Sequence, residues 1–387
     1  MVSIAARDAL LLLALASFAY YVVAIVAALR FFRPRDAASV SSDFTPPISI
    51  LKPIYGLDRE TYENYASFCA QDYPDYEILF CVSDDQDPAI PMIQQLARDF
   101  PQRRIHLLIG SELLGVSDKV NKLCRMAREA QHEILAVSDS DVRVEPEYLR
   151  AIAAPFRDPA VGAVTCLYRG LTDGSLAANL EAIGNSTDFA AGVLVAWLFA
   201  PVNFTLGATM ATTKKCLAEI GGFESLVDHF SDDYELGNRI AARGHRVELI
   251  TFPVSIVYPH QTLADAFRHQ LRWNVSIRFS RPAGHLGLIF TQALPLGLLA
   301  AIFAPSAAWA ISLLLGYLLL RGISAWVVGV YGMRDAGVRR HLELLPLRDA
   351  FAFIVWVASF FPQRIHWRGR EFYVRDKRLV PTTPREP

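Results

Sequence analysis

An apolar run near the start of the chain sets the strongest limit on how it can fold. Residues 9–32 read ALLLLALASFAYYVVAIVAALRFF, with Arg30 as the one charged side chain. A helix of about 20 apolar residues crosses a bilayer, and this run is too long for the core of a cleaved signal peptide. We therefore expect a retained transmembrane anchor over residues 1–33. Because Arg33 and Arg35 follow it, the positive-inside rule places the next domain in the cytosol.

Apolar segments return near the other end of the chain. Residues 284–303 and 306–330 are each long enough to span, and Pro305 separates them, so a transmembrane hairpin is expected over 284–332. The shorter run at 350–361 has basic residues on both sides. We therefore expect residues 344–362 to be re-entrant or interfacial, and 363–387 to form a basic cytosolic tail. The basic residues on the two sides are Arg334, Arg339, Arg340, Arg348, Arg364, Arg368, Arg370, Arg375, Lys377 and Arg378.

Composition excludes several other classes of protein. The chain has 387 residues and a net charge of −1, so no overall positive field favours nucleic acid as a partner. Its 52% hydrophobic and 20% charged residues suit membrane segments attached to a globular body. The five cysteines include no Cys-x-x-Cys pair, which indicates free thiols rather than a zinc or disulfide framework.

The middle of the chain, residues 46–280, has the pattern of an α/β domain. Short runs rich in β-branched and aromatic residues, such as ISILKPI, YEILFCVSD and EILAVSDSDV, alternate with amphipathic segments such as KVNKLCRMAREAQ. This alternation predicts βαβ units and a Rossmann-like, mostly parallel sheet. Ligands of such sheets bind beyond the carboxyl ends of the strands, where the acidic residues of this chain gather.

Two acidic clusters follow predicted strands. Asp84 comes after YEILFCVS, where a carboxylate can accept hydrogen bonds from a nucleotide, although a solvated Asp-rich turn is a simpler interpretation. Asp139 and Asp141 come after EILAVS, and two carboxylates at this spacing can hold Mg²⁺ or Mn²⁺ together with a diphosphate. The Asp-x-Asp spacing alone is common, so its place after a buried strand carries the interpretation.

Two further polar clusters fall on predicted helices. Asp232 and Asp233 precede ELGNRIAARG; adjacent carboxylates there suit a general base for a hydroxyl, although one could simply cap the helix. His269, Arg272 and Trp273 share a helix face. Arg272 could stabilise a departing diphosphate and Trp273 could line a sugar or lipid, or the helix could lie at the membrane surface. Lys119, in GVSDKVNKL, could neutralise a phosphate or be a solvated helix lysine.

These clusters occur in the order found in one large group of enzymes. From about Ile48 to Trp273 the chain resembles inverting, nucleotide-sugar-dependent glycosyltransferases with a GT-A fold. Among them it looks most like the ceramide glucosyltransferase family and its bacterial relatives that glycosylate hopanoids. The stretches that carry the resemblance are FCVSDDQDPAI, GVSDKVNKL, SDSDVRV, GGFESLVDHFSDDYELG and RHQLRW.

The resemblance implies a reaction and a role for each motif. Glucose would pass from UDP-glucose to the primary hydroxyl of ceramide, with inversion, at the cytosolic membrane face. Asp233 would be the base, and Asp139 with Asp141 would hold a divalent metal, Mn²⁺ or Mg²⁺. The other positions are expected on the donor side or, for Asp232 and His269, on the acceptor side. The expected donor-binding residues are Lys52, Asp84, Lys119, Asp139, Arg272 and Trp273.

The sequence departs from the family pattern at two places. His269 stands where the motif has Gln or Arg, and the segment before Gly207 lacks the His of the animal ceramide enzymes. Three alternatives therefore stay open: transfer of N-acetylglucosamine to a hopanoid polyol, a processive polysaccharide synthase, and a non-enzymatic membrane protein. If the protein is an enzyme, its expected partners are a UDP-sugar and the lipid bilayer. We expect a multi-pass membrane protein, in the inner membrane if the source is bacterial.

Overall fold

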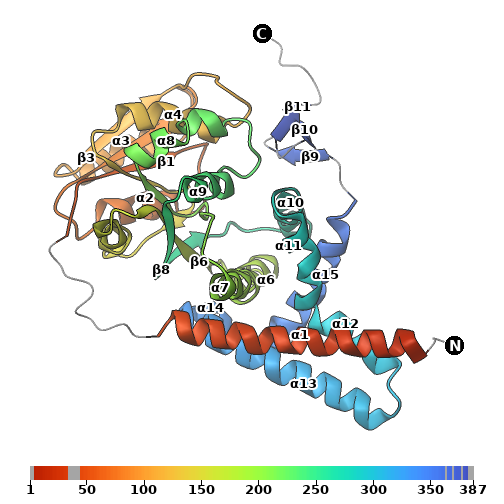
Figure 1. Ribbon diagram of the computed structural model, residues 1–387. Helices are drawn as coiled ribbons and strands as arrows, with labels where there is room; N and C mark the ends of the chain where they lie inside the picture. Colours follow the sequence, from red (N-terminus) through yellow and green to blue (C-terminus); the bar gives the residue numbers. More distant parts are fainter. Residues whose placement is uncertain (1–3, 34–43, 362–363, 368–369, 376–377, 382–387) are drawn as a thin grey trace. The chain divides into compact units, whose positions relative to one another are not determined.

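The computed structural model (Figure 1) describes residues 4–33, 44–361, 364–367, 370–375 and 378–381. Three of the expected basic residues, Arg35, Arg368 and Lys377, lie outside these ranges. The chain forms two compact units, each made of segments that are distant in sequence. The first unit comprises residues 1–33, 169–200 and 260–362, and the second comprises 34–168, 201–259 and 363–387.

The second unit is built on a sheet in the strand order β3-β2-β1-β4-β7-β6-β8-β5. Its first four strands are parallel to one another, and antiparallel pairing follows between β4 and β7, β7 and β6, and β8 and β5. The strands are β1 (Ile48–Pro53), β2 (Tyr76–Val82), β3 (Arg104–Ile109), β4 (Ile134–Val137), β5 (Val142–Arg143), β6 (Val161–Leu171), β7 (Met210–Thr213) and β8 (Arg246–Val257).

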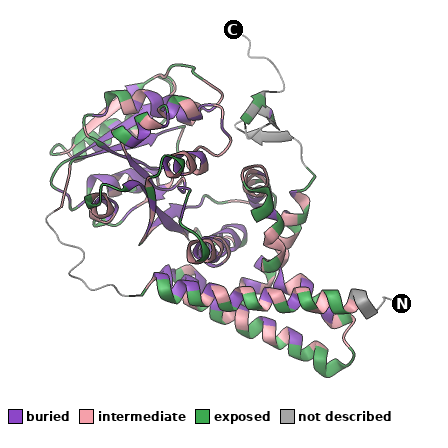
Figure 2. Cartoon of the chain, viewed as in Figure 1, coloured by how far each residue is buried: buried purple, intermediate pink, exposed green. Residues whose placement is uncertain are grey.

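Burial explains why the parallel half consists of nearly continuous apolar runs. Every residue of β1 and β2 is buried, and Figure 2 shows these strands in purple beneath the helices. Parallel sheets are covered on both faces, so their strands do not alternate between apolar and polar residues. The helices of this unit are α2 (Thr61–Cys69), α3 (Ile90–Asp99), α4 (Asp118–Glu129), α5 (Tyr148–Ala153), α8 (Lys214–Glu219) and α9 (Asp232–Ala242).

The strand register brings three carboxyl ends to one edge of the sheet. Leu51 of β1 lies opposite Val137, the last residue of β4, and Pro53, the last residue of β1, lies opposite Cys81 of β2. The loops after β1, β2 and β4 therefore leave the sheet together. Gly56, with φ +67°, turns the first of these loops, and its backbone N–H donates to Asp87 Oδ2 in the second at 3.1 Å.

The first unit is helical. Its helices are α1 (Ile4–Phe31), α6 (Leu176–Gly184), α7 (Ala190–Phe199), α10 (Leu263–Ser280), α11 (Pro282–Gly287), α12 (Ala293–Ile302), α13 (Ala307–Ala325), α14 (Ala336–Arg340) and α15 (Leu345–Ala358). A π-helical turn at Asn185–Phe189 joins α6 to α7. Segments 169–200 and 260–280, which the sequence assigns to the α/β domain, thus belong to this unit.

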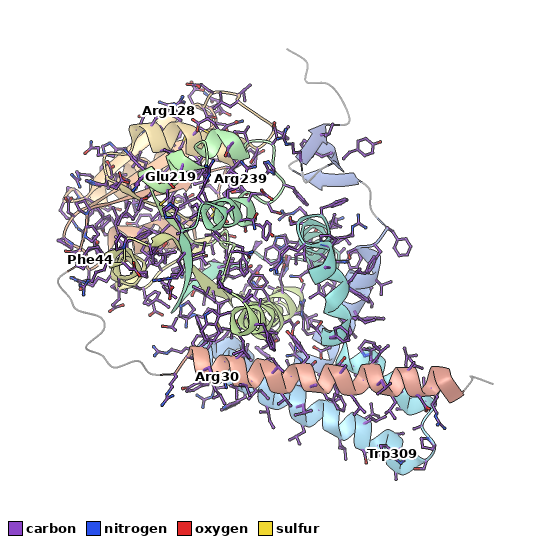
Figure 3. The ribbon with its side chains drawn as sticks, viewed as in Figure 1. Arg30, Phe44, Arg128, Glu219, Arg239 and Trp309 are labelled. Atoms are coloured by element: carbon purple, nitrogen blue, oxygen red, sulfur yellow. The ribbon has the colours of Figure 1, made fainter. Side chains whose placement is uncertain are left out.

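Within the described ranges, three helices are long and apolar enough to cross a membrane, at Arg7–Phe31, Leu176–Phe199 and Ala307–Gly332. The bent pair Pro282–Thr291 and Ala293–Ile302 would make a fourth if it forms one span. α1 and α13 run side by side, and Phe18 of α1 packs against Gly316 of α13 (Figure 1). Figure 3 labels Arg30 and Trp309 on this pair, and Figure 2 shows its outward face exposed along its length, which suits contact with lipid.

A buried charge cluster holds the helices of the first unit together. Arg321 of α13 is 2% exposed and donates to both carboxylate oxygens of Asp349 in α15 at 3.0 Å. It also donates to Asp188 in the π-helical turn at 2.5 Å. Arg348 donates to the other oxygen of Asp188 at 2.9 Å. Charges removed from water are tolerated when they are paired, as Arg321 is with Asp188 and Asp349, and Arg348 with Asp188.

The last described segment forms a three-stranded antiparallel sheet in the second unit. Its strands are β9 (Arg364–Trp367), β10 (Arg370–Arg375) and β11 (Arg378–Pro381). β11 also makes an isolated bridge between Arg378 and His229. The mixed α/β architecture, with apolar helices from both ends of the chain, confirms the predicted fold class.

Candidate functional site

The carboxyl edge of the sheet gathers most of the predicted site residues. Lys119, in the first turn of α4, reaches Asp139 Oδ1 at 2.9 Å and Asp232 Oδ2 at 3.2 Å. Asp139 follows β4, and Asp232 begins α9. One ammonium group therefore joins two carboxylates that lie 93 residues apart in sequence. Burial disfavours the charged ammonium, but Asp139 and Asp232 outweigh it and raise the pKa of Lys119.

Two loops are tied together so that Lys119 meets α9. The Ser117 N–H donates to the Val227 carbonyl at 2.8 Å, and the Val116 N–H donates to Asp228 Oδ1 at 3.0 Å. These bonds fix the segment before α4 against the segment before α9. Further along α9, Arg239 (labelled in Figure 3) donates to the Ser225 carbonyl at 3.1 Å. These bonds hold the N-termini of α4 and α9 next to each other.

Asp233 is held by two backbone N–H groups and one side-chain hydroxyl. Its Oδ2 accepts from the Gly207 N–H at 3.1 Å, its Oδ1 accepts from the Tyr234 N–H at 2.8 Å, and its carbonyl accepts from Thr205 Oγ1 at 2.6 Å. Burial, with the charge of Asp232 adding to it, raises the pKa of Asp233 to about 6 against the opposing effect of Lys119. A carboxylate in this state can accept a proton near neutral pH.

Gly207 marks the point where these groups converge. A methyl group on its Cα would lie 3.2 Å from Asp139 Oδ2, 3.4 Å from Asp233 Oδ2 and 4.0 Å from Lys119 Nζ. The absence of a side chain at this position therefore keeps the space between the carboxylates open. The sequence draws attention to Gly207 only as part of a turn, because a close approach of distant segments leaves no local signal.

Lys52 lies behind this cluster rather than at its surface. It is fully buried in β1, donates to the Asp139 backbone carbonyl at 2.8 Å, and lies 3.8 Å from the centroid of the Phe68 ring. Burial lowers the pKa of Lys52 to about 7, although Asp141 and Asp139 oppose that shift. The side chain therefore touches the backbone that presents Asp139.

The carboxylates at this edge fit a divalent cation. Burial, then the charges of Asp139 and Asp58, raise the pKa of Asp141 to about 7, so negative charge is crowded around it. Oxygen donors of this kind suit Mg²⁺ and Mn²⁺. Within the described part of the chain, no three His, Cys, Asp or Glu side chains form a complete metal cage. The arrangement therefore matches a cation that takes its remaining ligands from phosphate and water. Asp58 was not among the predicted site residues.

The remaining predicted residues belong to a different loop and to a helix of the first unit. Asp84 is exposed in the loop after β2, where its Oδ1 accepts from the Gln86 N–H at 2.9 Å. His269, Arg272 and Trp273 lie on α10, which belongs to the first unit. There His269 Nδ1 lies 2.6 Å from Glu181 Oε1. Glu181 was also missed from sequence, although a lone carboxylate in the apolar segment ANLEAIG is a recognisable signal.

Comparison with known proteins agrees with the resemblance read from the motifs. The sequence profile of the family described as Glycosyl transferase family 21 matches residues 9–380. Ceramide glucosyltransferase 3 of Caenorhabditis elegans is 24% identical over 385 residues, which cover 92% of this chain and 79% of that protein. Ceramide glucosyltransferase 1 of the same organism is 28% identical over 229 residues, which cover 59% of this chain and 49% of that protein.

A solved structure is similar in fold. The mannosyltransferase PcManGT from Pyrobaculum calidifontis, in complex with GDP-Man and Mn²⁺, superposes with a TM-score of 0.56 at 18% identity. The similarity covers 92% of this chain and 99% of that one. It confirms the GT-A fold expected from the sequence.

Proposed function

This chain belongs to glycosyl transferase family 21, and from that membership we propose that it transfers glucose from UDP-glucose to the primary hydroxyl of ceramide, at the cytosolic face of a membrane. One observation carries the proposal. Oxygen atoms of Asp139 and Asp233 and the ammonium of Lys119 converge on the open space at Gly207. A reaction that needs a base close to a phosphate-binding group requires this combination.

Asp233 is proposed as the base of a single displacement. Its carboxylate would take the proton from the lipid hydroxyl while that oxygen forms a bond to the anomeric carbon of the sugar. The bond between this carbon and the diphosphate oxygen breaks, and its electron pair leaves with UDP. Attack opposite the leaving group inverts the anomeric configuration. The pKa near 6 and the fixed orientation of the Asp233 carboxylate support this role.

The donor side is assigned to the strand-end residues. Asp84 would bind the uridine end, and Lys119 would neutralise a phosphate. Asp139 and Asp141 would hold Mn²⁺ or Mg²⁺, which would stabilise charge on the departing diphosphate. Arg272 is proposed to act on the same charge, with Trp273 beside it. Lys52, fully buried, would act by holding the Asp139 backbone in place.

The apolar helices support a lipid as the acceptor. Three described helices are long enough to cross a bilayer, and the two C. elegans relatives are named ceramide glucosyltransferases. An acceptor that keeps its acyl chains in the bilayer must meet an enzyme held at the membrane surface. The basic residues that follow the first apolar run in the sequence support the proposed cytosolic placement of the site.

The test is a product assay with purified full-length protein in lipid nanodiscs. UDP-glucose and UDP-N-acetylglucosamine are each combined with ceramide or a hopanoid polyol, in the presence of Mn²⁺, and the lipids are analysed by mass spectrometry. The proposal predicts glucosylceramide. Glycosylation of the hopanoid, or a polymer, would replace the proposed substrates, and no glycolipid from any combination would contradict lipid glycosylation.

A further inference from the structure

A carboxylate inside the helical unit is completely buried and yet fully hydrogen-bonded. Glu181 of α6 is 0% exposed and lies within the apolar span Leu176–Phe199. An ionised carboxylate in such surroundings costs several kcal/mol unless its oxygens are paired. Ionisable residues at such positions usually serve a function, so the partners of Glu181 indicate what it does.

The hydrogen-bond partners of Glu181 are two residues of α10 and Gln261, which lies two residues before that helix. Its Oε1 accepts from Gln270 Nε2 at 3.0 Å and lies 2.6 Å from His269 Nδ1. Its Oε2 accepts from Gln261 Nε2 at 2.6 Å. Gln261 directly precedes Thr262, the N-cap of α10, while the other two lie in the second turn. One carboxylate therefore fixes the start of α10 and its rotation about its own axis.

The contact continues from His269 to Trp273, which with Arg272 forms the pair singled out in the sequence. The rings of His269 and Trp273 lie 4.6 Å apart at 58°, one helical turn from each other. Arg272 precedes Trp273 and shares this face of the helix. A change in the position of His269 must therefore move the surface against which Trp273 packs.

A second contact holds the opposite side of Gln270. Its Oε1 accepts from Arg348 Nη2 at 3.3 Å, and Arg348 also donates to Asp188 at 2.9 Å. Gln270 thus links Glu181 to the charge cluster that joins α15 to the π-helical turn before α7. The amide nitrogen and the amide oxygen of Gln270 are thus both hydrogen-bonded, and these bonds hold α10 against α6 and α15.

We propose that Glu181 is a positioning residue that sets the orientation of Arg272 and Trp273. It does so by holding α10 through its contacts with Gln261, His269 and Gln270. The inference rests on the proposed function, because it acts through the role given there to Arg272. It also explains why a histidine is accommodated at position 269: its ring nitrogen is used by Glu181, and its ring face by Trp273.

A double-mutant cycle tests this inference. Glu181→Gln removes the charge while keeping the size of the side chain, and it is made in wild-type protein and in Arg272→Ala. We expect Glu181→Gln to lower kcat at least about tenfold in the first background and less than about twofold in the second, since groups that act as a unit are not additive. Equal losses in both backgrounds, or no loss in wild type, would overturn the proposal.

Glu219→Gln is the matched control. Glu219, on α8 (Figure 3), lies 2.6 Å from His245 Nε2, the same separation as in the Glu181–His269 pair, and neither Glu219 nor His245 is among the groups proposed to act. Activity should remain within about twofold of wild type. If Glu181→Gln does not fold, Gln261→Leu removes only the contact to Oε2. We then expect a smaller loss of kcat that is again non-additive with the loss caused by Arg272→Ala. Fully additive losses of kcat would contradict the inference.

A measurement without substrate separates this inference from the proposed function. The tryptophan emission due to Trp273 is obtained as the difference between each protein and its Trp273→Phe counterpart. This difference spectrum should shift in Glu181→Gln and stay unchanged in Glu219→Gln. An unshifted spectrum in Glu181→Gln would contradict the positioning of α10 by Glu181, even if the enzyme is active. If the spectrum shifts but the protein makes no glycolipid, the result supports the positioning of α10 by Glu181 and contradicts the proposed reaction.

Discussion

At the residue scale, the carboxylates around Gly207 differ in role because their surroundings differ. Asp139 is paired with Lys119, whereas Asp233 is oriented by backbone N–H groups. The backbone N–H groups fix the direction of the Asp233 carboxylate without supplying a full positive charge. Burial can therefore raise the pKa of Asp233. These surroundings suit Asp233 to accept a proton near neutral pH.

The raised pKa of Asp233 predicts an acidic limit to activity. Below about pH 6 its carboxyl group is protonated and cannot accept a proton, so kcat should fall about tenfold per pH unit on the acidic side and level off above the pKa. The measurement is kcat from pH 4.5 to 8 at saturating donor and acceptor. Asp85→Asn, which alters an exposed carboxylate in the loop after β2, should keep the same profile. A profile that is flat down to pH 5 would contradict Asp233 as the base.

Gly207→Ala should lower activity more than stability. The added methyl group would lie 3.2 Å from Asp139 Oδ2 and 3.4 Å from Asp233 Oδ2, so both oxygens must shift by a few tenths of an ångström. We expect kcat to fall about tenfold or more, with the melting temperature nearly unchanged. Gly297→Ala, where the structure has no atom within 4 Å of the new carbon, is the control and should leave kcat intact. Equal activity of the two variants would show that the space at Gly207 is not used.

At the element scale, the sequence predicted strands and helices best where local pattern decides them. The β-branched runs ending at Asp84 and Asp139 are strands, as expected. The antiparallel half of the sheet was not predicted, because pairing direction depends on contacts between distant segments. The place of α10 was missed for the same reason: its partners, Glu181 and Arg348, lie more than 70 residues away.

Asp349 joins α13 to α15 in the buried charge cluster. Asp349 of α15 accepts from Arg321 through both oxygens and from Tyr317 at 2.9 Å. Asp349→Ala leaves the buried Arg321 guanidinium with Asp188 and Thr187 as its hydrogen-bond acceptors among the described residues, and should lower the free energy of unfolding by about 3 kcal/mol. Denaturant titration in detergent measures this. Asp8→Ala, which removes an exposed ion pair with Arg7, should change little, and an equally small effect of Asp349→Ala would contradict the account.

At the scale of the whole molecule, hydropathy predicted the division into membrane helices and an α/β body. It could not predict that segments 169–200 and 260–280 join the helical unit. The first contains the 24-residue stretch Leu176–Phe199, which is apolar enough to span, yet its sequence is typical of a globular domain because Glu181 and Asp188 interrupt it. Only the structure shows that these charges are satisfied by partners elsewhere in the chain.

Removal of divalent cations should abolish transfer by the intact protein. The carboxylates of Asp139 and Asp141 crowd negative charge at the strand ends, and a cation that binds there would also hold the donor diphosphate. Glycolipid formation should stop in EDTA and recover with Mn²⁺ or Mg²⁺, and Asp141→Asn should need a higher metal concentration for half-recovery. Full activity in EDTA would rule out a metal requirement.

The central claim is that Asp233 activates a lipid hydroxyl for attack on a UDP-sugar. The most direct test is the rate of UDP release from UDP-glucose with and without ceramide, for wild-type protein and Asp233→Asn. The account predicts release that depends on ceramide in wild type and falls about 10²–10⁴-fold in the variant, while UDP-glucose still binds. Ceramide-dependent release at the wild-type rate in Asp233→Asn would contradict it.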